Sequence, residues 1–121
     1  LELLPRTAQA DYAALLAEHD AGLSLMHTPH PSMVPIEMAA AGLATVTSTY
    51  ANKTAQALTA ISSNLIAAEP TIEGVAAGLR AAEAAAEDAA ARVAGADVQW
   101  PRSWDESFPD ALLARVEELL G

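Results

Sequence analysis

The chain of 121 residues contains no cysteine and is poor in basic and aromatic side chains. Without cysteine it can form neither a disulfide nor a cysteine-based metal site. Six basic against 16 acidic residues give a formal net charge of −10. This charge argues against duplex nucleic acid or an anionic membrane as a partner, because both are bound through lysine and arginine. Apolar runs stay far below the roughly 20 residues that span a bilayer, so we expect no transmembrane segment.

Short apolar runs alternate with helical patterns along the chain. We predict strands at residues 21–26, 43–47 and 64–67, with a strand remnant at 1–4, and helices at 11–18, 33–41, 54–60 and 70–95. An irregular linker and a final helix, begun by a capping signature at Ser107 and Asp110, complete the chain over residues 98–121. Strands that alternate with helices are typical of a parallel sheet covered on both faces. The sequence therefore predicts one domain with a Rossmann-like, three-layer α/β/α fold.

A proline-punctuated loop at residues 27–31 joins the first of these strands to the following helix, for which Ser32 is a predicted N-cap. Ligands of open parallel sheets bind beyond the carboxyl ends of the strands, and helix N-termini bind anions. We expect the free amides near Met33 and Val34 to bind a pyrophosphate without help from a lysine. An ordinary turn between strand and helix is the alternative.

Three polar side chains lie in or beside this loop. Glu37 interrupts an otherwise apolar helix, where its carboxylate could accept two hydrogen bonds from the diol of a sugar or ribose. A glutamate that merely favours the positive end of the helix explains it equally well. His27 and His30 lack the partners of a zinc site, so we expect no metal and assign them either to ligand contacts or to loop packing.

Arg6 and Lys53 are the only cations among the first 68 residues, and each follows a predicted strand. Either could balance the charge of a bound phosphate, although a solvated side chain is the usual state of such a residue. No glycine-rich dinucleotide motif, Walker motif or Gly-x-Ser-x-Gly elbow occurs, which argues against a dinucleotide enzyme, a phosphate-loop NTPase or a serine hydrolase. Trp100 and Trp104 are expected to anchor the final linker on the domain.

Several separate motifs resemble the donor-binding domain of family 4 type GT-B glycosyltransferases, in particular the bacterial rhamnosyltransferase branch that builds cell-surface polysaccharide. They cover about residues 11 to 108 and are Gly22-Leu23-Ser24-Leu25-Met26, His30-Pro31-Ser32, Pro35-Ile36-Glu37-Met38-Ala39-Ala40-Ala41-Gly42, Val46-Thr47, Ile61-Ser62-Ser63-Asn64-Leu65-Ile66 and Trp100-Pro101-Arg102-Ser103-Trp104. By this resemblance Glu37 matches the second glutamate of the Glu-x7-Glu motif, which binds the ribose hydroxyls of the donor. The first glutamate falls on Pro29, where the sequence departs from the family.

The resemblance implies the incomplete C-terminal half of a GT-B fold, whose acceptor-binding domain would precede it. The expected function is to bind the nucleotide sugar of a hexosyltransferase, for example dTDP-rhamnose, for transfer to a cell-surface glycan without a metal or other cofactor. The donor-binding residues are then Glu37, His30, Ser32, Met33, Val34, Arg6 and Lys53, and no catalytic residue is assigned. The full-length enzyme is expected in the cytoplasm or at the inner face of the membrane, and this part alone should be inactive. A small, non-catalytic α/β binding or protein-interaction module is the alternative.

Overall fold

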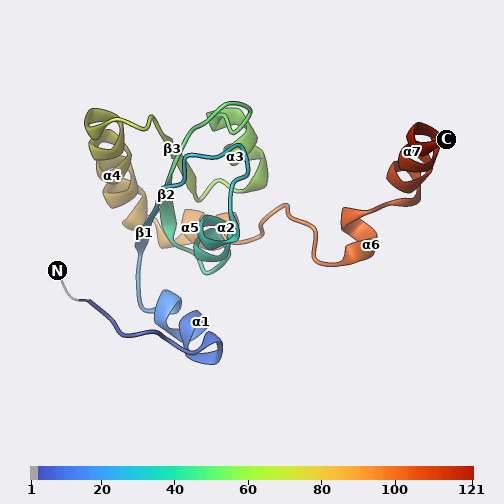
Figure 1. The fold of residues 1–121 in the computed structure, drawn as a ribbon. Coiled ribbons are helices and arrows are strands. Elements are labelled where there is room, and N and C mark those ends of the chain that lie inside the picture. Colours follow the sequence, from blue (N-terminus) through green and yellow to red (C-terminus); the bar gives the residue numbers. More distant parts are fainter. Residues whose placement is uncertain (1–2) are drawn as a thin grey trace.

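Three parallel strands form the centre of the molecule in the computed structural model, which describes residues 3–121 (Figure 1). The strands are β1 (Ala21–Ser24), β2 (Ala44–Ser48) and β3 (Leu65–Ala68), and they lie side by side in chain order. Leu23 pairs with Val46, which in turn pairs with Ile66. Every residue of β2 is buried, as expected for the middle strand of a parallel sheet.

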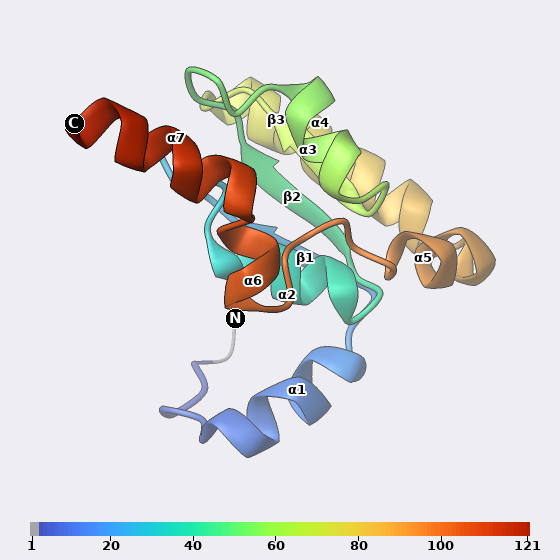
Figure 2. The same ribbon diagram turned by 90° about the vertical axis from the view of Figure 1, so that its right-hand side faces the viewer.

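Helices cover both faces of the sheet, which confirms the predicted three-layer α/β/α fold. Viewed from the side of the C-terminal helix, α2 (Met33–Ala40) and α3 (Ala55–Ile61) lie in front of the strands and α4 (Ile72–Ala86) lies behind them (Figure 2). The side chains separate into two small cores accordingly. The core on the side of α2 and α3 is built on Ala39, Leu58 and Leu65, and the core beneath α4 on Ala44, Val46, Ala68 and Ala82.

The unit of β1, α2 and β2 matches the sequence prediction to within a residue or two. Gly42 ends α2 with φ of +88°, a left-handed conformation that glycine adopts without the steric cost of a Cβ. The chain then enters β2 directly. This crossover places the loop after β1 at the carboxyl edge of the sheet, next to the start of α2.

The N-terminal part differs from the prediction. Leu3 and Leu4 form no strand, and Leu1 and Glu2 lie outside the described residues. The helix predicted next is present as α1 (Gln9–Ala17). β1 is not the buried strand that its apolar sequence predicted: it lies at an edge of the sheet, and Leu23 keeps 43% of its surface exposed.

The long helix predicted over residues 70–95 is two helices. α4 ends at Ala86, and α5 (Ala89–Gly95) begins after Asp88, whose carboxylate accepts a hydrogen bond from the amide of Ala91 at 2.9 Å. Aspartate is a good N-cap because its side chain satisfies an amide that the helix leaves free. The predicted apolar stripe also fails at both ends, since Ile72 is 84% and Val93 is 74% exposed.

The C-terminal segment lies apart from the rest of the molecule (Figure 1). It consists of α6 (Trp104–Ser107) and α7 (Asp110–Leu120), neither of which has a buried residue. The final helix was predicted, but its predicted cap at Ser107 is wrong: Ser107 ends α6, and Pro109 precedes α7 without a side-chain cap. The serine that caps a helix here is Ser103, at the start of α6. The apolar face of α7 is exposed rather than packed, and it consists of Leu112, Leu113, Val116, Leu119 and Leu120.

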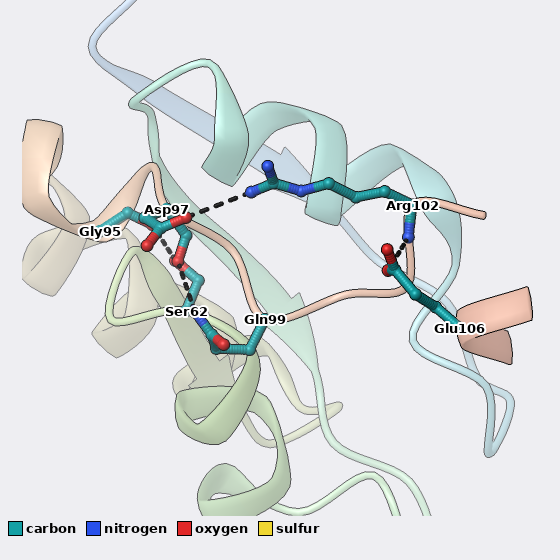
Figure 3. Close-up of polar contacts among 6 residues, drawn as sticks. All are labelled: Ser62, Gly95, Asp97, Gln99, Arg102 and Glu106. Carbon is teal, nitrogen blue, oxygen red and sulfur yellow. Dashed lines mark hydrogen bonds and ion pairs between the residues drawn. The ribbon is translucent and has the colours of Figure 1, made fainter. Parts of the chain in front are cut away.

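The linker before α6 is tied to the end of α3 up to Gln99, whose backbone amide donates to the carbonyl of Ile61 at 2.8 Å. Close by, the hydroxyl of Ser62 donates to the carbonyl of Gly95 at 2.6 Å (Figure 3). Beyond Gln99 the side-chain polar contacts stay within the linker, α6 and α7. Among them, Arg102 is joined to Asp97 and to Glu106 (Figure 3). Within residues 3–121, no helix is both long and apolar enough to cross a membrane.

Candidate functional site

The loop from Met26 to Ser32 connects the carboxyl end of β1 to the start of α2, and its first residue is held firmly. The hydroxyl of Ser48 accepts from the Met26 amide at 3.1 Å and donates to the Met26 carbonyl at 2.9 Å. The ammonium group of Lys53 donates to the same carbonyl at 2.6 Å. Two groups from the end of β2 and the turn after it therefore fix the root of the loop.

Lys53 itself is 97% buried, with a relative exposure of 3%. No ion pair among residues 3–121 includes Lys53, so the hydrogen-bond partner of its ammonium group is a neutral carbonyl. Burial lowers the pKa of Lys53 below its ordinary value of 10.5, because a low-dielectric environment disfavours the ammonium form. A buried cation without a carboxylate is costly, and such groups concentrate at functional sites. Lys53 follows β2, as the sequence predicted.

The opening turn of α2 is uncapped. Ser32 occupies the N-cap position, but its hydroxyl makes no cap hydrogen bond, so the predicted capping role is wrong. Within the described part of the chain, no group accepts from the amides of Met33 and Val34. Ser32 has φ of 72° and ψ of 154°, a conformation that is unusual for any residue but glycine. Two amides without a hydrogen-bond partner, those of Met33 and Val34, thus directly follow a residue in a strained conformation.

The two histidines of the loop both contact an aromatic ring. His27 lies edge-on to Tyr50, with 4.2 Å between ring centroids, and His30 lies edge-on to Trp100 at 6.0 Å. The contact by Trp100 confirms that this residue anchors the linker, here against the loop. Trp104 does not: it is 79% exposed and stacks on Phe108. Nδ1 of His30 also accepts a hydrogen bond from the amide of Ser32 at 2.9 Å.

Glu37 is exposed on α2, and its charge acts on Tyr12 of α1. Burial raises the pKa of Tyr12 in α1, and the negative charge of Glu37 raises it further. The carboxylate makes no hydrogen bond or ion pair with residues 3–121, so it is available to a ligand on the side of Tyr12.

Arg6 lies in the irregular segment before α1 and is exposed. The strand that was predicted to place it beside the ligand does not form at Leu3 and Leu4. No hydrogen bond within residues 3–121 joins Arg6 to the loop or to α2. The structure therefore groups His30, Ser32, Met33 and Val34 at one turn and holds Lys53 at the root of the same loop, but it does not bring Arg6 to them.

An open groove of about 870 Å³ runs from this loop along α4. Met26, His27 and Ser48 form its end at the carboxyl edge of the sheet, while Leu25, Val75 and Leu79 form its apolar walls. Among residues 3–121 no group of three or more histidine, aspartate or glutamate side chains is arranged to hold a metal ion.

Sequence reasoning missed Ser48 and Tyr50 as residues of this region. Both follow the apolar part of β2, at the carboxyl edge where ligands of parallel sheets bind, so their position was a usable signal. What the sequence could not show is that Ser48 pairs with Met26, which lies 22 residues earlier in the chain.

Comparison with known proteins supports the resemblance to a glycosyltransferase-related domain. No solved structure matches the chain. The O-antigen biosynthesis protein RfbC of Myxococcus xanthus is 46% identical over 67 residues, which cover 55% of this chain and 5% of that protein. The family described as "WsaF, C-terminal domain" matches residues 1–80, which include β1, α2, β2, β3 and the loop with His30 and Ser32. The chain is a glycosyltransferase-related domain and belongs to this family of WsaF C-terminal domains.

Proposed function

We propose that this chain is the part of a GT-B glycosyltransferase that binds the diphosphate of a nucleotide sugar, and that the diphosphate lies at the opening turn of α2. The observation that carries the proposal is the pair of amides of Met33 and Val34, which no group in the described chain satisfies. A helix N-terminus favours negative charge through its free amides and its dipole. The same donors would stabilise the charge that grows on the diphosphate as the sugar leaves.

The buried ammonium of Lys53 supports an anionic ligand. It lacks a carboxylate partner among residues 3–121 and uses one of its three donors on the Met26 carbonyl. A diphosphate bound at the loop would supply the missing negative charge. The positive charge of Lys53 is important here because the chain has a net charge of −10, which repels an anionic ligand.

Glu37 is proposed to accept hydrogen bonds from the ribose hydroxyls, as the resemblance implies. Its carboxylate is exposed one turn beyond the free amides, on the same helix. Tyr12, whose pKa the negative charge of Glu37 helps to raise, is proposed to border the same hydroxyls. Pro29 replaces the acidic residue that usually meets the donor sugar.

The family and the relative support a proposal for the substrate and the setting. A protein of O-antigen biosynthesis is 46% identical to this chain over 67 residues, although the match covers only 5% of that protein. We propose transfer of a hexose, for example rhamnose from dTDP-rhamnose, to a cell-surface glycan. A separate acceptor-binding domain would supply the general base, and no metal or other cofactor is required.

A titration of the ¹⁵N-labelled chain with dTDP and with UDP, followed by NMR, tests this proposal. We expect saturable binding that is weakened in both Glu37→Gln and Lys53→Met. Glu87→Gln is a matched control because it removes the same charge from the exposed end of α4 and should leave binding unchanged. Binding by the wild type that all three variants retain would reject the proposed residues, and no binding of either nucleotide would reject the function.

The exposed apolar face of α7 is the observation that favours the other candidate, a protein-interaction module. Five apolar residues of this helix are between 43% and 82% exposed. In that case neither nucleotide would bind, and partner binding would depend on α7 instead of α2.

A further inference from the structure

The hydrogen bond between the amide of Ser32 and Nδ1 of His30 defines the state of the imidazole ring. The distance is 2.9 Å, and the backbone amide can only be the donor. Nδ1 must therefore be free of a proton. A neutral imidazole with a bare Nδ1 carries its proton on Nε2.

His30 is in turn held by two further contacts. Its carbonyl accepts a hydrogen bond from the hydroxyl of Thr28 at 3.0 Å, and its ring lies edge-on to Trp100 at an interplanar angle of 88°. The ring thus reaches Ser32 from a fixed position. A serine with φ of 72° persists only where its surroundings hold it there.

We propose that His30 is the positioning residue of the diphosphate site: as its Nε2–H tautomer, it holds Ser32 in its positive-φ conformation and thereby keeps the amides of Met33 and Val34 directed at the ligand. The diphosphate ligand in this inference rests on the proposed function, whereas the contact between His30 and Ser32 does not depend on it. The contact copies a turn in which an asparagine side chain accepts from the amide two residues later.

Two substitutions separate this role from a direct contact between His30 and the ligand. In His30→Asn the side-chain oxygen can still accept from the Ser32 amide, whereas the longer side chain of His30→Gln places its amide near the former Nε2. We expect His30→Asn to bind inorganic pyrophosphate as the wild type does. His30→Gln and His30→Ala should bind roughly three- to tenfold more weakly, the effect of losing one neutral hydrogen bond.

Two measurements without ligand test the same inference. The ¹⁵N spectrum of the wild-type ring should show an unprotonated Nδ1 and a protonated Nε2 near neutral pH. Hydrogen exchange at the Ser32 amide should be slow in the wild type and in His30→Asn, and faster in His30→Gln. Melting curves of the variants show whether each is folded.

A proton on Nδ1, or equal exchange at Ser32 in all variants, would overturn the inference. So would a variant series in which His30→Gln binds normally and His30→Asn does not, because this order indicates a contact through Nε2. If wild-type protein does not bind pyrophosphate at all, the proposed function fails, while the tautomer and the exchange of Ser32 still decide whether His30 holds the turn.

Discussion

Helices α4 and α7 are both amphipathic, yet only α4 is part of the folded body. In α4 the contact face is made of small residues, and Gly78 and Ala82 are buried against the sheet. In α7 the face is made of large residues, and Leu113 remains 44% exposed. The residues with more apolar surface are thus the ones that stay in contact with solvent.

Surface complementarity explains the difference. Gly78 lets the backbone of α4 approach Val46 of the central strand so closely that an added Cβ would lie 2.8 Å from Cγ1 of that valine. Among residues 3–121, by contrast, no residue of α7 is buried against another part of the chain. An apolar stripe therefore predicts a helix, but burial depends on what the rest of the chain places opposite it.

The largest expected contrast between the two regions comes from truncating one leucine in each. Leu58 is 1% exposed in α3, and Leu58→Ala should cost about 2–5 kcal/mol of unfolding free energy. Leu113→Ala in α7 should change it by less than about 0.5 kcal/mol. Urea denaturation of both variants measures the two values. A similar loss in both would show that α7 packs on the body in solution.

Enlarging a side chain in each helix should reveal the same difference between α4 and α7, with a smaller loss of stability. Gly78→Ala places a methyl group against Val46 and Ala68, and overpacking of this kind costs about 1–3 kcal/mol. Ala114→Leu in α7 adds more atoms to an exposed position and should leave the melting temperature unchanged. An unaffected Gly78→Ala variant would contradict the close approach of α4 to β2.

Helix caps sharpen the comparison further. Asp88 caps α5 in the body, and Asp88→Ala should destabilise the protein by about 1 kcal/mol. Ser103 caps α6 outside it, so Ser103→Ala should unravel that short helix without altering the denaturation midpoint of the body. Equal shifts of the midpoint would indicate that the two regions unfold together.

The smallest expected effect is a pH dependence that the two regions do not share. Because burial lowers the pKa of Lys53 in the folded protein, the folded state binds fewer protons than the unfolded state between that lowered pKa and 10.5. The free energy of unfolding of the wild type should therefore rise with pH across this interval, relative to that of Lys53→Met. Arg115→Met removes an exposed cation from α7 but keeps Lys53, so its pH profile should stay parallel to that of the wild type. Parallel pH profiles for the wild type and Lys53→Met would contradict the burial of Lys53.

Local signals were sufficient for much of the fold. The short apolar runs and Gly42 predicted β1, α2 and β2 nearly to the residue, because turns and helix stops depend on nearby residues. The break at Asp88 was missed, since an alanine-rich sequence on both sides favours one continuous helix. The exposure of β1 and α7 could not be predicted, because burial depends on distant parts of the chain.

The candidate site was predictable only in outline. The position of the loop before α2 followed from the topology of parallel sheets, and so did the free amides at Met33 and Val34. The burial of Lys53 depends on the carbonyl of Met26, which is 27 residues away in the chain. The role of His30 toward Ser32 needed the positive φ of the serine, which its sequence did not indicate.

The most direct test of the anion site is to map which backbone amides respond when dTDP is added to the ¹⁵N-labelled chain. The free amides at the start of α2 predict that Met33 and Val34 show the largest chemical-shift changes, with smaller changes through residues 27–37. Changes centred on α7 or on the groove around Ile72, with Met33 and Val34 unmoved, would contradict the account.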